Sequence, residues 1–281
     1  MINHAFLGVL LVVLVQNAVA QPTANILTRI SMVESAYSRG TVFSLDVDNR
    51  EYWITAKHVL TGAKHPPYGS IKKKSEQLRI LQGQQWLMVE FSLLDPGEDI
   101  DIAVLAPSRL LLSNPIPSLI PSSNGVTLGG DCQFLGYPYG DGWPITFNTG
   151  TAVWFPYVKR CGVSAMGGKG GKGFWTLDGI NNAGFSGGPV TYLTGSQQQV
   201  FAVVSGYRTE AVDVITSPLP KPPAAPPALI PPQHKGSQAK GAAARAKQTV
   251  NVNSGFIFAY DIQYAIDAIR KNPVGPLRNA K

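Results

Sequence analysis

One short segment, Gly184–Pro189, constrains the fold and chemistry of this chain more than any other. It reads Gly-Phe-Ser-Gly-Gly-Pro and runs into an apolar, strand-like stretch that ends at Leu193. Gly184 and Gly187 permit a tight backbone path that β-carbons would obstruct. This path can aim the N–H groups of Gly184 and Ser186 at one point beside the Ser186 hydroxyl, the arrangement that acyl transfer requires. The alternative is a glycine-rich turn with an exposed serine. The rest of the sequence decides between a nucleophilic serine and such a turn.

Composition favours a β-rich chain. The 281 residues include 29 glycines and 22 prolines, with 44% hydrophobic and 15% charged residues. This is the composition of a turn-rich globular protein, long enough for one large domain or two small ones.

Residues 1–20 have the features of a signal peptide. They contain no Lys, Arg, Asp or Glu, and the apolar run Ala5–Val15 ends near Ala18-Val19-Ala20, a small-residue cleavage pattern. The run is too short to span a bilayer comfortably. We therefore expect an exported protein, periplasmic or secreted, that begins near Gln21 and does not span the membrane after cleavage. An uncleaved anchor is the alternative.

The two cysteines, Cys132 and Cys161, can pair only with each other, and an exported protein can form that disulfide. Two free buried thiols are the alternative. No Cys or His cluster has metal-ligand spacing, and we expect no metal and no cofactor.

Two further segments carry groups that could assist Ser186. The hairpin pattern of residues 41–56 leads into His58, which lies in an apolar frame where a satisfied core histidine is the alternative. Asp99 and Asp101 then share one face of the strand-like stretch 98–105. A carboxylate there requires a partner such as an imidazole, unless it lies on an exposed edge.

Two segments of the second half have unusual composition. Residues 162–173 contain six glycines, which predicts a mobile loop; we hypothesise that its ordering shapes the oxyanion hole. Residues 214–250 form a proline-rich and then basic insertion, most simply a solvated spacer. A last strand at 255–260 and a helix over 261–271, with Asp261 as N-cap, follow.

His58, Asp101 and Ser186 occur in the chain order of the chymotrypsin-like proteases. Thr55–Val59 resembles the T-A-A-H segment of that family, Asp101–Leu105 resembles its D-(I/L)-A-(L/V)-L strand, and Gly184–Pro189 matches G-x-S-G-G-P. The chain is most similar in pattern to bacterial exported HtrA-like trypsin-like peptidases, which share a segment like Gly136–Gly140, but no PDZ-like domain follows. The resemblance covers about residues 30–272, apart from the insertion.

The resemblance implies an all-β fold of two antiparallel six-stranded Greek-key β-barrels with a short C-terminal helix. The first barrel would span 25–115 and the second 120–272, with the insertion at about 214–250, and the active site would lie between them.

The family roles apply to the matching residues. Ser186 would attack the scissile carbonyl, His58 would act as general base, and Asp101 would orient His58. The N–H groups of Gly184 and Ser186 would bind the oxyanion, and Ser205 would support the aspartate from the strand beside the substrate.

Two positions depart from the digestive members of the family. Phe185 replaces the aspartate that receives a new N-terminus, so activation by that ion pair is not expected. Ile180 lies where the base of the specificity pocket is expected, which predicts an apolar P1 residue.

The sequence therefore predicts an exported serine endopeptidase acting on polypeptides. The alternative is a protease-fold binding module with weak or lost activity. Polyanion binding is a third possibility from the charge of +7, but no stacking aromatic residues accompany the lysines, and no specific nucleic acid partner is expected. The oligomeric state is open.

Overall fold

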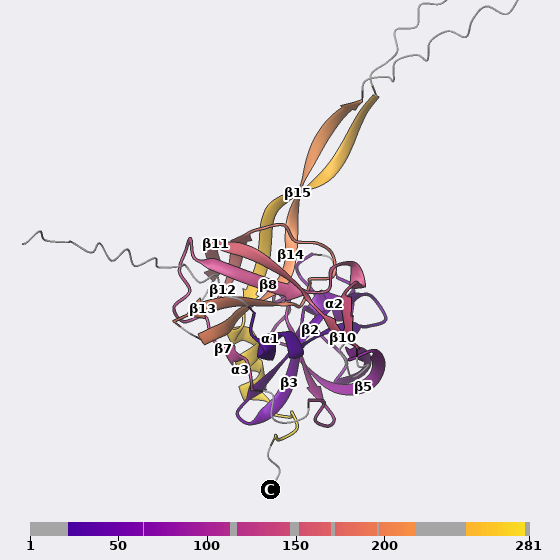
Figure 1. The fold of residues 1–281 in the computed structure, drawn as a ribbon, viewed down its shortest axis with the longest axis vertical. Helices are drawn as coiled ribbons and strands as arrows, with labels where there is room; N and C mark the ends of the chain where they lie inside the picture. The colour runs from indigo at the N-terminus through magenta and orange to yellow at the C-terminus, as the bar shows by residue number, and fades with distance from the viewer. Residues whose placement is uncertain are drawn as a thin grey trace, which may run out of the picture.

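The computed structural model is an all-β protein built of two barrels (Figure 1), as the sequence predicts. It describes residues 22–63, 65–112, 117–146, 152–169, 172–195, 197–216 and 246–278. The predicted signal peptide, residues 1–20, lies outside these ranges. In the described ranges, no helix has both the length and the apolar character needed to cross a bilayer.

The first barrel closes on itself with the strand order β1-β2-β3-β6-β5-β4. Its strands are β1 (Ile30–Glu34), β2 (Arg39–Val47), β3 (Arg50–Thr55), β4 (Ser75–Gln82), β5 (Gln85–Leu94) and β6 (Ala103–Pro107). The predicted turn between β2 and β3 forms with Asp48 and Asn49 both at positive φ, 49° and 61°. Two such residues make the tight hairpin connection that matches the twist of the strands.

The second barrel is a sheet in the order β13-β8-β11-β12-β15-β14-β7, closed by an additional β13–β14 pairing. The short β7 joins β14 in parallel. The strands are β7 (Ile120–Pro121), β8 (Asp131–Gly136), β11 (Tyr157–Lys169), β12 (Lys172–Asp178), β13 (Pro189–Thr194), β14 (Gln197–Thr216) and β15 (Ala246–Asp261). Between β8 and β11 lie the 3-10 turn η1 (Pro138–Gly140) and a separate two-stranded sheet of β9 (Trp143–Thr146) and β10 (Ala152–Phe155).

In the part of the chain that the structure describes, three short helices accompany the strands: α1 (Ala24–Thr28), α2 (Lys57–Thr61) and α3 (Gln263–Lys271). The predicted C-terminal helix begins two residues later than expected, because Asp261 is the last residue of β15. Asp261 nevertheless accepts a hydrogen bond from the Gln263 N–H at 2.8 Å, so it still satisfies the start of the helix.

The glycine-rich segment 162–173 is not a mobile loop, and that prediction is wrong. Within the described residues it forms the end of β11 and the start of β12, paired from Gly162↔Asp178 to Lys169↔Lys172. The ring of Phe174 supplies the packing that Gly167 lacks: a β-carbon on Gly167 would lie 2.6 Å from Phe174 Cζ. An aromatic residue opposite a glycine stabilises such a strand.

Strands also reach into both ends of the predicted insertion. β14 continues to Thr216 and β15 begins at Ala246, and together they form a two-stranded arm that leaves the barrel (Figure 1). Residues 217–245, the greater part of the insertion, lie outside the described chain.

The packing unites the two barrels. Each has its own apolar core, and a third cluster combines first-barrel residues such as Phe43 and Ile54 with Leu135, Val203 and Ile266 of the second barrel and α3. Beyond α3, residues 275–278 return to the first barrel as a strap. Glu51 N–H donates to Pro276 O at 3.0 Å, and Arg278 Nε lies 2.9 Å from Asp46 Oδ1.

Candidate active site

His58 and Asp101 come together at the end of β3. His58 is the second residue of α2, which starts where β3 ends, and Asp101 lies in the loop that leads into β6 rather than inside a strand. His58 Nδ1 is 2.7 Å from Asp101 Oδ2, and the His58 backbone N–H donates to Asp101 Oδ1 at 2.8 Å. Asp101 therefore holds both the ring and the backbone of the histidine.

The second barrel completes the surroundings of this carboxylate. Ser205 Oγ donates to Asp101 Oδ2 from β14, and Tyr68 OH lies 3.5 Å from Ser205 Oγ. Asp101 is fully buried, whereas Asp99 is exposed, and its backbone carbonyl accepts a hydrogen bond from Tyr260 OH at 3.0 Å. The structure thus places Asp101, and not Asp99, against His58.

The Ser186 segment is held by the first barrel. Thr41 of β2 donates its N–H to Ser186 O at 2.8 Å and its Oγ1 hydroxyl to Gly184 O at 2.7 Å. Gly187 has φ +86°, and a β-carbon there would lie 2.2 Å from Thr41 O. The close approach of the two barrels at this point therefore requires glycine, as the sequence predicts.

Gly184 is equally confined. Its φ is +100°, and a β-carbon would lie 2.2 Å from Tyr137 O. The Tyr139 N–H donates to Ala183 O, which fixes the residue before Gly184. Within the described chain, no hydrogen-bond acceptor is found for the N–H groups of Gly184 and Ser186.

Among the described residues, the Ser186 hydroxyl makes no hydrogen bond to His58. It donates to the backbone carbonyl of Ser205 at 3.2 Å. The hydroxyl has to give up this hydrogen bond before it can donate to His58.

A buried ion pair beside His58 was not anticipated from the sequence. Lys57 is fully buried, and its Nζ lies 2.6 Å from Asp95 Oδ1. Lys57 also donates to Gly97 O, in the loop that leads to Asp101. A lysine inside the apolar frame of His58 is the signal that could have revealed this pair, because a charge in such a frame requires a partner.

Ile180 lies on the surface, with 56% of its area exposed. Lys159 binds its loop, donating to Ile180 O at 2.7 Å and to Asn182 Oδ1. Burial lowers the pKa of Lys159. Asn253 of β15 donates to Asn181 O at 2.6 Å, so the base of the arm contacts the segment that precedes Ser186.

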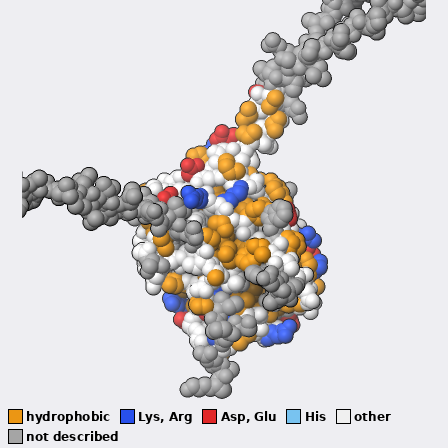
Figure 2. All heavy atoms as spheres, in the orientation of Figure 1, with side chains coloured by type: hydrophobic (Ala, Val, Ile, Leu, Met, Phe, Trp, Pro, Cys, Tyr) orange, Lys and Arg blue, Asp and Glu red, His pale blue; other side chains and the backbone are white. Residues whose placement is uncertain are grey.

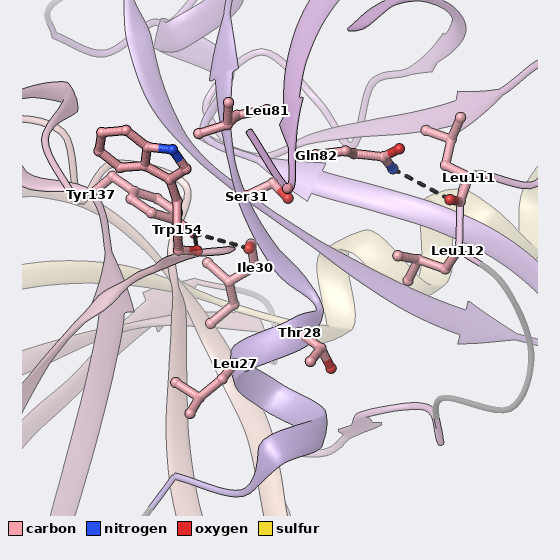
Figure 3. Close-up of a pocket in the computed structure, with 11 residues that line it drawn as sticks. Leu27, Thr28, Ile30, Ser31, Leu81, Gln82, Leu111, Leu112, Tyr137 and Trp154 are labelled. Carbon is pink, nitrogen blue, oxygen red and sulfur yellow. Dashed lines mark hydrogen bonds between the residues drawn. The ribbon is translucent and has the colours of Figure 1, made fainter. Parts of the chain in front are cut away.

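A cavity of about 240 Å³ is lined in part by Tyr137, the residue that precedes the turn η1 (Figure 3). Tyr137 and Trp154 lie on one side of it, and Leu111 and Leu112 on the other. Tyr137 OH lies 3.0 Å from Trp154 O and 3.2 Å from Ile30 O, so its one proton has two carbonyl acceptors within reach, and burial raises the pKa of this tyrosine. None of the predicted site residues lines this cavity.

Two other predictions concern covalent and metal chemistry. Cys132 and Cys161 lie opposite each other on β8 and β11 and are joined by a disulfide. Among the residues that the structure describes, no group of three His, Cys, Asp or Glu side chains is arranged to hold a metal ion.

The model of the trypsin-like peptidase domain matches residues 40–203, which include His58, Asp101 and Ser186. The chain belongs to the trypsin-like peptidase family. It is therefore a serine endopeptidase by family, a hydrolase with polypeptide substrates. No curated protein matches the chain.

Solved structures share the fold. Rv3671c protease in an inactive form is 18% identical, with a TM-score of 0.50 over 88% of this chain and 90% of that chain. A serine-to-alanine mutant of the same protease from M. tuberculosis H37Rv is 16% identical, with a TM-score of 0.50 over 92% and 98%. The HtrA-type protease AlgW with a tripeptide is 17% identical, with a TM-score of 0.49 over 89% and 63%.

Proposed function

We propose that this trypsin-like peptidase is exported and cleaves peptide bonds through Ser186, His58 and Asp101. The observation that carries the proposal is the buried Asp101 carboxylate, which accepts hydrogen bonds from the His58 ring, the His58 backbone and Ser205. A carboxylate so placed fixes the orientation of the imidazole and stabilises the imidazolium that forms during acyl transfer.

The reaction begins when the Ser186 hydroxyl gives up its hydrogen bond to Ser205 O and donates to His58. His58 accepts the proton as Ser186 Oγ attacks the scissile carbonyl, and the N–H groups of Gly184 and Ser186 stabilise the oxyanion. His58 then donates the proton to the leaving amine. Water hydrolyses the acyl-enzyme by the same route, and no cofactor takes part.

An apolar P1 residue fits the chemistry around Ile180. Its side chain offers an exposed apolar surface, and the Lys159 ammonium binds its loop. A lysine or arginine at P1 would bring a second positive charge toward Lys159, which like-charge repulsion disfavours.

Export is supported by the signal-peptide features of residues 1–20 and by the Cys132–Cys161 disulfide, since disulfides persist in oxidising compartments. The periplasm and the extracellular medium both meet this requirement.

A protease-fold binding module is the second candidate, and the Ser186 hydroxyl favours it by donating to Ser205 O rather than to His58. Labelling with a fluorophosphonate probe separates the two. A catalytic triad predicts covalent labelling of the wild type, with no labelling of Ser186→Ala and a large loss in His58→Ala. An unlabelled wild type that binds polypeptide would establish the binding module.

A further inference from the structure

One face of the arm formed by β14 and β15 carries a cluster of valines, with Glu210 on the same face opposite Val252, and the other face is polar. Val212 pairs with Val250 across the two strands, and Val214 and Val252 lie on the same face at the two-residue period. These four valines are 38–42% exposed. The opposite face carries the pairs Ala211↔Asn251 and Asp213↔Thr249. Figure 2 shows hydrophobic side chains on the arm, away from the body of the molecule.

One edge of β14 is also open. The strand pairs with β13 as far as Val203, and the Val204 backbone bonds to Gly187 and Gly188. From Ser205 onward, β15 is the one strand that pairs with β14 in the described chain. Unpaired strand edges present backbone donors and acceptors that attract extended peptides.

The open edge starts at the nucleophile. Ser205, its first residue, accepts the Ser186 hydroxyl hydrogen bond through its carbonyl. A peptide antiparallel to β14 runs from the arm toward Ser205, so its C-terminal end arrives at Ser186. The residues N-terminal to the scissile bond then lie along the arm.

We propose that the arm docks the segment of a polypeptide substrate that precedes the scissile bond, and that it selects extended segments rich in aliphatic side chains. The proposal rests on the proposed function of Ser186. The substrate adds a strand to β14, and its alternate aliphatic side chains lie beside Val212 and Val214, which pack in turn against Val250 and Val252 of β15. At one substrate residue per residue of β14, such a segment is about ten residues long. Unfolded proteins offer segments of this kind.

A second copy of the chain fits this face less well. Stable protein interfaces bury about 1,200–2,000 Å², and four partly exposed valines provide only a small part of that area. A flexible peptide that pairs with the edge requires less apolar surface, because backbone hydrogen bonds contribute to its binding.

Two fluorogenic peptides with the same scissile sequence test the proposal. One carries an N-terminal extension of about ten residues that alternate valine and threonine, and the other has none. A variant replaces all four valines by threonine: Val212→Thr, Val214→Thr, Val250→Thr and Val252→Thr. Threonine keeps the side-chain shape and the strand preference of valine. We expect its kcat/KM to fall about tenfold for the extended peptide, the loss of about 1.4 kcal/mol of binding, and to stay unchanged for the short one.

The opposite face of the arm provides the matched control. Ala211→Thr with Asn251→Thr alters a cross-strand pair on the polar face and should leave kcat/KM unchanged for both peptides. Equal kcat/KM of wild type and valine variant for the extended peptide would overturn the proposal. A change in sedimentation mass of the valine variant, with unchanged kinetics, would assign the face to contact between copies.

A measurement of peptide binding tests the docking surface independently of catalysis. Fluorescence anisotropy of the labelled extension, measured on Ser186→Ala with and without the four threonines, should show weaker binding when the valines are replaced. If wild type cleaves neither peptide but this difference is present, the proposed triad function fails and the docking surface stands. Equal affinities would reject the docking surface whatever the activity.

Discussion

Lys57 and Asp95 form an ion pair, 2.6 Å between Nζ and Oδ1, in which the lysine side chain is fully buried. Lys57 directly precedes His58, and Gly97, whose carbonyl it binds, lies in the loop that ends at Asp101. The first two residues of α2 therefore hold the same loop at two points.

We predict that Lys57→Met lowers kcat by roughly tenfold to a hundredfold, because small displacements of reacting groups have effects of this size. It also leaves Asp95 without its ion-pair partner, which lowers stability. The rate of fluorophosphonate labelling measures the effect on Ser186, and thermal unfolding measures stability. Lys73→Met, at an exposed lysine of the same barrel, should change neither.

The double variant Lys57→Met with Asp95→Asn separates positioning from stability. It removes both charges, so stability should recover relative to Lys57→Met, while labelling stays slow. Recovery of the labelling rate together with stability would show that Lys57 has a structural role alone.

The same pair predicts a pH dependence of stability. Burial raises the pKa of Asp95, but hydrogen bonds from Lys57, Ile71 and Gly97 outweigh it and hold the pKa below its ordinary value. A lowered pKa means that the ionised carboxylate stabilises the folded state above about pH 4, and that this contribution is lost as the pH falls further. The difference in Tm between wild type and Asp95→Asn should be largest above pH 5 and shrink toward pH 2–3. A constant difference would contradict the assignment.

Asp101→Asn should lower kcat by roughly 10⁴-fold, because the imidazole loses the carboxylate that sets its tautomer. Asp99→Asn is the control. Its side chain is exposed, so kcat should stay within about twofold of wild type, since surface substitutions of this kind have small effects. The opposite ranking, measured with one short peptide, would transfer the orienting role to Asp99.

Gly187→Ala should abolish labelling of Ser186, because the new β-carbon would lie 2.2 Å from Thr41 O and 2.3 Å from Thr55 Oγ1. Gly83→Ala tests the effect of backbone conformation alone. Gly83 also has positive φ, +59°, but its β-carbon would meet nothing within 4 Å. That variant should lose about 1 kcal/mol of stability and retain full labelling.

Arg278→Met should destabilise the protein by about 3 kcal/mol, in the range found when a buried ion pair loses one partner. The Arg278 side chain is 7% exposed and pairs with Asp46 and Glu51 of the first barrel. Urea unfolding measures the change. Arg270→Met, at an exposed arginine 3.5 Å from Asp48, should be near neutral.

Local motifs made the site predictable. Three short segments carry the signal: Gly184–Pro189 and the residues around His58 and Asp101. In each, a few neighbouring residues specify both the backbone conformation and the reactive group, so the identity and order of the candidate catalytic residues could be predicted without coordinates. The contacts that hold these segments together could not. Thr41 binds Gly184 and Ser186 across 143 or more positions, and nothing in its local sequence distinguishes it from other strand threonines.

The wrong predictions also have a physical origin. Local propensity makes 162–173 a loop, but residues 162–169 pair with β12, Gly162 also pairs with β8, and Phe174 covers Gly167. Pairing with neighbouring strands outweighs the weak strand preference of glycine. The predicted barrel boundaries, 25–115 and 120–272, remain predictions.

The strap has a consequence for synthesis on the ribosome. Arg278 and its neighbours contact residues 46–52, which are translated more than two hundred positions earlier. The first barrel can collapse while the chain is still growing, but Asp46 and Glu51 acquire their last partner only after residue 278 has emerged. The first barrel is therefore translated first but completes its ion pairs last. Release of the nascent chain before Arg278 is translated would leave Asp46 and Glu51 of the first barrel without this partner.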